Sequence, residues 1–207
     1  MIRILGRRNS SNVRKVLWLC EELEAAYAQE DWGRGFQSAR SPGFLALNPN
    51  GRIPVLVQDA FVMWESHAIL RHLARTLDGG ASLYGPDAQS IAHIDQWLDW
   101  TLSVCAPPLH AVFQAFRTGS ADASATPAID AAKKNAVDAF ALAGEQLRAG
   151  AFICGDALTI ADCAFGVHLH RAFSIDLLTS ADSALADYRE RLRGRPAYIA
   201  TVEAGGP

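Results

Sequence analysis

The first eighty residues alternate short apolar runs with longer stretches of helical periodicity. Ile2–Leu5 predicts a strand, and apolar residues at helical spacing from Val13 to Leu23 predict a helix that begins after the polar turn Asn9–Ser11. Tyr27–Trp32 predicts a second strand. This order of elements predicts a βαβ unit at the start of the chain.

The next part of the chain predicts a β-hairpin followed by a helix. A short helix near Gly43–Leu47 precedes Asn48–Gly51, whose sequence Asn-Pro-Asn-Gly is typical of a turn. Two apolar runs, Val55–Val57 and Phe61–Met63, flank a three-residue connection and predict the hairpin. Glu65–Leu77 carries apolar residues on one face and arginines on another, which predicts a helix. The whole pattern is therefore βαβ followed by ββα.

Everything after about residue 88 shows helical periodicity and little that resembles a strand. The segment 79–87 is rich in Gly, Ser and Pro, which is typical of a linker. Ser90–Leu102 and Ala128–Ala149 predict two long helices. We therefore expect an α/β domain over residues 1–78, a linker over 79–87 and an all-helical domain over 88–207.

Two signals mark helix ends in the second domain. A loop of small residues at 118–126 separates the two long helices, and Gly150 is expected as the C′ residue that ends the second. Thr159 and Asp162 have the spacing of an N-cap and N3 pair, a variant of the capping box. Asp162 also suits the positive end of a helix dipole. A further helix is predicted to begin there.

Composition and charge exclude several classes of protein. Half of the 207 residues are hydrophobic, which is enough for a substantial core. The formal charge is −3, so we expect neither a nucleic-acid partner nor binding to an anionic membrane. Because the chain has no run of about 20 apolar residues and only a short apolar run near its start, we expect no membrane span, no signal peptide and a cytoplasmic location.

Cysteine and histidine positions do not indicate a metal site. The cysteines show no CxxC pattern and no zinc-type pairing with histidine, and the histidines lack ligand spacing. We expect reduced cysteines that serve mostly in packing. The residues concerned are Cys20, Cys105, Cys154 and Cys163, and His67, His72, His93, His110, His168 and His170.

Four motifs, in this order and spacing, resemble those of the cytosolic glutathione transferases. They are Ser10–Val16, Asn48–Pro54, Trp64–Ser66 and the Thr159–Asp162 cap. The resemblance covers nearly the whole chain and is to bacterial serine- or asparagine-type enzymes, similar to the theta and nu classes. It implies the glutathione transferase fold, in which a thioredoxin-like βαβ-ββα domain precedes an all-α domain.

The resemblance also implies a glutathione site. If Ile53-Pro54 is cis, as in the family, the Ile53 backbone N–H and C=O can pair with the cysteinyl part of glutathione. Glu65 and Ser66 would hold the charged ends of the γ-glutamyl group, and Arg52 would contact the glycyl carboxylate. From the residues alone, an ordinary trans proline, a simple helix cap and a solvated arginine are the alternatives.

The thiol chemistry is expected in the polar turn before the first helix. Ser10 matches the catalytic serine of theta-like classes, and Asn12 matches the asparagine of nu-like classes. Ser11 could contact the sulfur or cap the helix, so all three stay candidates, with Ser10 preferred. The turn lacks the tyrosine or cysteine used by other classes. His67 stands where the family often has asparagine or aspartate, a departure that we expect to leave the chemistry untouched.

The expected function is glutathione S-transferase activity, in which the glutathione thiolate attacks a hydrophobic electrophile, as in detoxification. Glutathione would be a co-substrate, with no metal. A glutathione-dependent disulfide-bond reductase and a non-catalytic glutathione- or ligand-binding module are the alternatives. The resemblance further implies a homodimer, for which Phe61, Met63 and Trp64 on one side and Trp97, Trp100 and Val104 on the other are the candidate contact residues.

Overall fold

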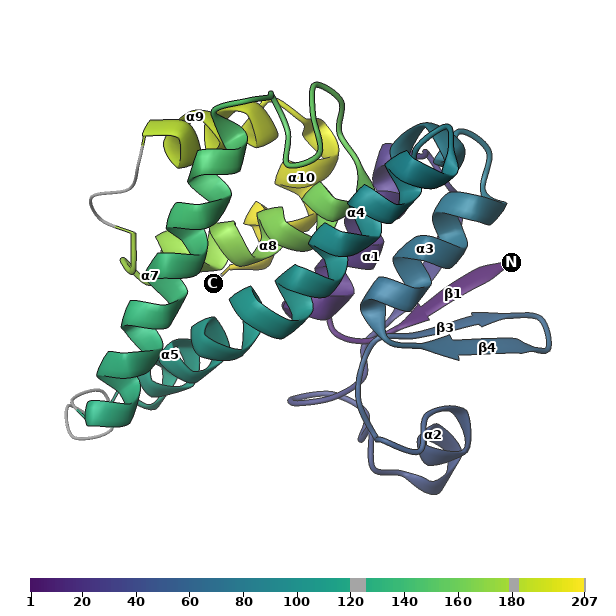
Figure 1. The fold of residues 1–207 in the computed structure, drawn as a ribbon. Coiled ribbons are helices and arrows are strands. Elements are labelled where there is room, and N and C mark those ends of the chain that lie inside the picture. The colour runs from purple at the N-terminus through teal and green to yellow at the C-terminus, as the bar shows by residue number, and fades with distance from the viewer. Residues whose placement is uncertain (120–125, 179–182, 207) are drawn as a thin grey trace. The chain divides into compact units, whose positions relative to one another are not determined.

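The computed structural model, drawn in Figure 1, describes residues 1–119, 126–178 and 183–206. The chain forms two compact units. The first consists of Met1–Pro86 together with Pro196–Gly206, and the second of Asp87–Arg195. The all-helical domain was expected over residues 88–207, whereas the structure places Pro196–Gly206 with the first unit.

The first unit is built on a four-stranded mixed sheet with the strand order β2-β1-β3-β4. β1 pairs in parallel with β2, and it pairs antiparallel with β3, which in turn pairs antiparallel with β4. The expected strands and hairpin are therefore confirmed. Their bounds are β1 Ile2–Leu5, β2 Tyr27–Glu30, β3 Val55–Gln58 and β4 Phe61–Trp64.

Helices α1 and α3 pack against each other in this unit. Apolar residues of α1 from Val13 to Cys20 are fully buried, which explains the helical spacing seen in the sequence. The short helix expected near residues 43–47 is also present. The helical bounds are α1 Ser11–Glu22, α2 Pro42–Leu47, α3 Ser66–Thr76 and α10 Pro196–Thr201.

The C-terminal segment completes the first unit by packing on α1. The guanidinium of Arg14, a buried residue, donates to the backbone carbonyls of Gly205 and Gly206. Trp18 meets Tyr198 edge to face, with ring centroids 4.9 Å apart. Residues 180 or more positions apart in the chain thus share one core.

The second unit is helical throughout its named elements. The structure corrects the boundary at Leu102, because the helix expected to end there continues through a π-helical turn, Thr101–Cys105, into α5. Pro107 and Pro108 then lie in the first turn of α5, where a missing N–H is tolerated. Most of the expected loop at 118–126 lies outside the described residues. The bounds are α4 Ala88–Trp100, α5 Ala106–Thr118, α7 Pro127–Leu147, α8 Ile160–Ser174 and α9 Ser183–Arg193.

The expected capping signal before α8 is confirmed and extends beyond a local cap. The fully buried carboxylate of Asp162 accepts from the backbone N–H and hydroxyl of Thr159, at 2.8 and 2.9 Å. It also accepts from the Ile153 N–H at 2.9 Å and the Tyr188 hydroxyl at 2.8 Å. Burial raises the pKa of Asp162, and these four hydrogen bonds oppose the rise. Asp162 therefore ties α8 to the loop before it and to α9.

Candidate active site

Strand register brings the predicted site segments to one edge of the sheet. Leu5 of β1 lies opposite Val55 of β3, and Val55 lies opposite Trp64 of β4. The loop after β1 leads to Ser10, Pro54 directly precedes Val55, and Glu65 directly follows Trp64. Because adjacent strands are about 4.8 Å apart, these three chain segments meet within a small region.

Gly6 allows the first of these segments to approach the second. Its φ is +153°, and a Cβ at this position would lie 2.5 Å from Cγ2 of Val13 and 3.1 Å from Cβ of Ile53. A side chain could not fit in that space without displacing both neighbours. The glycine thus lets the start of α1 and the loop that carries Ile53 pack closely.

The candidate residues for the thiol lie at the N-terminus of α1. Ser10 occupies the N-cap position, and its carbonyl accepts the Arg14 N–H at 2.9 Å, but its hydroxyl makes no capping bond. Ser11 is the first residue of the helix. The Asn12 side-chain oxygen accepts from Nζ of Lys15 at 3.1 Å. The Ser10 hydroxyl is therefore available to a ligand beside the positive end of the helix dipole.

The loop before β3 contains the cis Ile53-Pro54 peptide expected from the sequence. Asn48 holds the turn, since its side-chain N–H donates to the Arg52 carbonyl at 2.7 Å. Within the described part of the chain, the Ile53 backbone N–H and C=O make no hydrogen bond. This is the arrangement that an extended peptide needs in order to pair with the loop. Arg52 is exposed.

The junction of β4 and α3 has an unusual backbone. Glu65, the N-cap of α3, has φ +71° and ψ 114°, a conformation that non-glycine residues rarely adopt. Strained backbone of this kind persists where the surrounding structure holds it, and it is common at binding sites. Glu65 is exposed, whereas Ser66 is buried at the first position of the helix. A carboxylate and a helix N-terminus are thus placed side by side.

Two arginines near this edge were not singled out in the sequence. Burial, followed by repulsion from Arg34, lowers the pKa of Arg7. Burial and, to a smaller extent, Arg7 lower the pKa of Arg14 to about 10. Both side chains remain cationic at neutral pH, so the region between β1 and α1 favours an anionic ligand. The only sequence signal was that Arg7 follows Gly6, the glycine directly after β1.

Cys20 and Cys154 are poorly suited to supply a thiolate. Burial raises the pKa of both Cys20 and Cys154 to about 12.

Among the described residues, no group of three or more His, Cys, Asp or Glu side chains could hold a metal ion. In the same part of the chain, no helix is both long enough and apolar enough to cross a bilayer.

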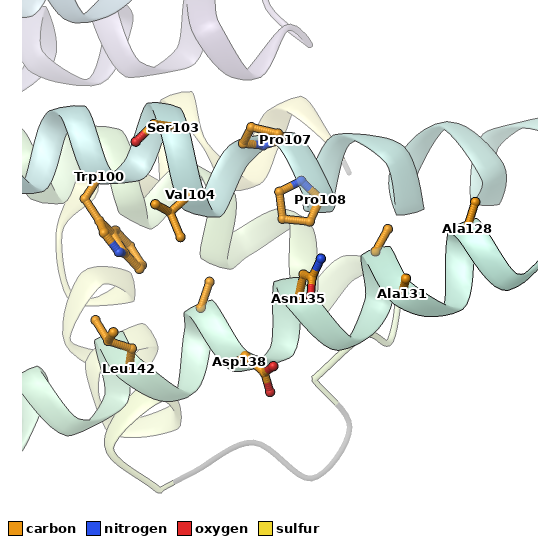
Figure 2. Close-up of a pocket in the computed structure, with 12 residues that line it drawn as sticks. Trp100, Ser103, Val104, Pro107, Pro108, Ala128, Ala131, Asn135, Asp138 and Leu142 are labelled. Carbon is orange, nitrogen blue, oxygen red and sulfur yellow. The ribbon is translucent and has the colours of Figure 1, made fainter.

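The second unit contains an apolar groove of about 680 Å³ between the π-helical turn and α5 on one side and α7 on the other. In Figure 2, Trp100 and Leu142 lie at one end of this groove and Ala128 at the other, with Pro107 and Pro108 between them. Ser103, Asn135 and Asp138 add polar groups to its lining.

The chain combines a βαβ-ββα unit that carries a cis-proline loop with a helical unit. These features place it in the class of proteins that join a thioredoxin-like ligand-binding unit to a helical unit. Within this class, residues 2–75 match the N-terminal domain of glutathione S-transferases, and residues 126–196 match their C-terminal domain. The chain is 32% identical over 204 residues to glutathione S-transferase GstB of Escherichia coli, covering 98% of each chain. It therefore belongs to the glutathione S-transferase family.

Solved structures agree with this assignment. A theta class glutathione S-transferase from Xanthomonas axonopodis pv. citri, with glutathione bound, has a TM-score of 0.84 and 33% identity, and the match covers 97% of this chain and 96% of that one. A delta-class enzyme from Nilaparvata lugens matches with a TM-score of 0.89 at 23% identity, over 99% of this chain and 94% of its own. The family resemblance, the fold class and the transferase activity expected from the sequence are confirmed.

Proposed function

We propose that the protein binds glutathione at the edge of the sheet described above and activates its thiol with the Ser10 hydroxyl. The observation that carries this assignment is the position of Ser10, which stands at the N-cap of α1 without capping the helix. The cis-proline loop and the Glu65–Ser66 junction lie at the same sheet edge. Glutathione bound there would have its sulfur near α1.

The groups at this site can supply the free energy that is needed to lower the pKa of the glutathione thiol. A thiol with a pKa of about 8.5 is only about 3% ionised at pH 7, and lowering that pKa by two units requires about 2.7 kcal/mol. A hydroxyl that donates to the sulfur anion contributes about 1.5–3 kcal/mol, and the helix N-terminus adds about 0.3–1 kcal/mol. Arg7 and Arg14 add a positive field.

The remaining groups have separate roles in holding the tripeptide. The Ile53 backbone pairs with the cysteinyl part, Glu65 and Ser66 hold the γ-glutamyl ammonium and carboxylate, and Arg52 contacts the glycyl carboxylate. In the reaction, the thiol proton leaves to solvent. The sulfur then forms a bond to an electrophilic carbon, and the leaving group departs with its bonding electrons.

Assays in parallel test this assignment against a disulfide-bond reductase, the second candidate, which rests on the match of Asn12 to the asparagine of nu-like classes. We expect conjugation of a chlorinated nitroaromatic to exceed reduction of 2-hydroxyethyl disulfide. The reverse order would make the protein a reductase. Glutathione binding by calorimetry with neither activity would make it a binding module.

Alanine substitutions of Glu65 and Ser66 should each weaken glutathione binding by about 1.5–3 kcal/mol, because each leaves a charged end of the γ-glutamyl group without its partner. Calorimetry measures this directly. Glu22→Ala serves as a matched control, since this residue is the last of α1, at the opposite end of the helix from the proposed site. Unchanged affinity in both variants would remove Glu65 and Ser66 from the site.

We also propose that the protein is a cytoplasmic homodimer. None of its four cysteines, all of which lie in the described part of the chain, forms a disulfide, as is usual in a reducing compartment. Both units carry exposed apolar side chains, Phe61 and Trp64 on β4 and Val104 and Leu142 beside the groove of Figure 2. Apolar patches of this kind are often covered by a partner. Trp97, in contrast, is buried and serves the core of its own unit.

Sedimentation at micromolar concentration should give a species of about twice the 22.3 kDa chain mass. Val104→Arg places a charge at the rim of the groove and should shift the equilibrium toward monomer, whereas the matched change Leu102→Arg, also exposed but outside the lining, should shift it less. A wild-type species near 22.3 kDa would overturn the dimer.

A further inference from the structure

Lys15 lies in the interior of the first unit with only 1% of its surface exposed, an unusual position for an ammonium group. Its Nζ is 3.1 Å from Oδ1 of Asn12 and 3.0 Å from Nε2 of His67. Asn12 belongs to the first turn of α1, and His67 is the second residue of α3. One buried cation thus links the turn proposed to activate the thiol with the helix proposed to hold the γ-glutamyl group.

The chemistry of these groups fixes their orientation. An ammonium has three N–H donors and no acceptor, so it must face the carbonyl oxygen of the Asn12 amide and the lone-pair nitrogen of the His67 ring. The Asn12 amide nitrogen, with its two N–H groups, is therefore turned away from Lys15. By the same reasoning, the ring proton of neutral His67 lies on Nδ1.

We propose that Lys15 is a positioning residue that orients Asn12 so that its amide N–H groups point to the glutathione sulfur as a second donor beside Ser10. This inference rests on the proposed function. Without Lys15, the Asn12 amide could rotate and present its oxygen, which would repel a thiolate. His67 is the second acceptor that holds the ammonium in place. His67, which was expected to leave the chemistry untouched, thus supports it indirectly.

The test is the pKa of the thiol of bound glutathione, read from the ultraviolet absorbance of the thiolate as a function of pH. Lys15→Met removes the charge and keeps an unbranched side chain. We expect it to raise that pKa by about one unit, and so to reduce the thiolate at neutral pH by up to about tenfold, with the glutathione affinity within about threefold of wild type. Lys15→Arg should restore part of the effect because it still donates.

A double-mutant cycle separates positioning from general stabilisation. In an Asn12→Ala background, Lys15→Met should cause no further change in the thiol pKa, because the group that Lys15 orients is gone. An equal change in both backgrounds, or none in either while the protein remains folded by circular dichroism, would overturn the proposal.

Asn12→Asp covers the case in which Lys15→Met does not fold. Aspartate keeps an acceptor for Lys15 and suits the N-terminal turn of a helix, but it has no N–H to donate. This variant should raise the thiol pKa at least as much as Asn12→Ala, and a wild-type value in both variants would overturn the inference. If the wild-type protein itself fails to lower the pKa of bound glutathione, the proposed function falls with it. A lowered value in both wild type and Lys15→Met removes only the role of Lys15.

Discussion

Ser10→Ala is expected to lower the turnover of glutathione conjugation by about ten- to a thousandfold, while the affinity for glutathione stays within about threefold. The lost hydrogen bond acts on the sulfur anion and not on the docking of the peptide. Since the Ser10 hydroxyl does not cap α1, its removal should also leave the helix intact. Stopped-flow or steady-state rates, together with calorimetry, measure the two effects separately.

The pH dependence of the rate identifies the donor. In Ser10→Ala, the acidic limb of the profile should move to higher pH, because the thiol pKa rises when the donor is lost. Ser11→Ala is the matched control, a neighbouring hydroxyl at the first helical position. An acidic limb that stays in place in Ser10→Ala and moves in Ser11→Ala or Asn12→Ala would transfer the role to that residue.

Local patterns were sufficient to predict most of the first unit. The strand Ile2–Leu5 and the hairpin around Gln58–Phe61 follow from apolar runs interrupted by turn residues, and both are present in the sheet. The Thr159 and Asp162 pair predicted the start of α8 because capping acts over only three residues. Signals of this kind depend on near neighbours in sequence.

Two helix ends show where local patterns mislead. The helix expected to end at Leu102 instead continues through the π-helical turn into α5, whose first turn accommodates Pro107 and Pro108. Gly150 was expected as the C′ residue, but α7 ends at Leu147, and its C-cap is Arg148 in a right-handed conformation. A Cβ at Gly150 would lie 2.8 Å from the Gly155 carbonyl oxygen. The glycine is required by a close approach of two backbone segments, which the helix pattern does not contain.

The parts of the site that the sequence left open depend on contacts between distant residues. Ser10, Ser11 and Asn12 look alike as polar turn residues, and only the structure shows which hydroxyl fails to cap and which amide is held by Lys15. Lys15 itself resembles a surface residue in sequence, but it is buried, and its Nζ lies 3.0 Å from Nε2 of His67, 52 positions away. Arg14 likewise finds its partners 191 and 192 positions away. No periodicity encodes such pairs.

The largest expected loss of stability follows from replacing Asp162. Its two carboxylate oxygens accept four hydrogen bonds in a fully buried position, from Ile153, Thr159 and Tyr188. Asp162→Ala leaves these donors without an acceptor, and we expect a loss of at least about 3 kcal/mol in the free energy of unfolding. Asp162→Asn should cost nearly as much, because its amide brings N–H groups to a place where only acceptors fit.

Asp87→Ala is the matched control for Asp162, since it removes an exposed N-cap carboxylate that accepts from the Gln89 and Ser90 N–H groups, both at 2.9 Å. It should cost only about 0.5–2 kcal/mol, the usual range for a helix cap. Tyr188→Phe, which removes one of the four donors and leaves the others paired, should cost about 1 kcal/mol. Urea unfolding followed by circular dichroism compares the variants. Because the Asp162 carboxylate joins α8, its preceding loop and α9 into one core, a cost no greater than that of Asp87→Ala would mean that packing alone holds these elements together.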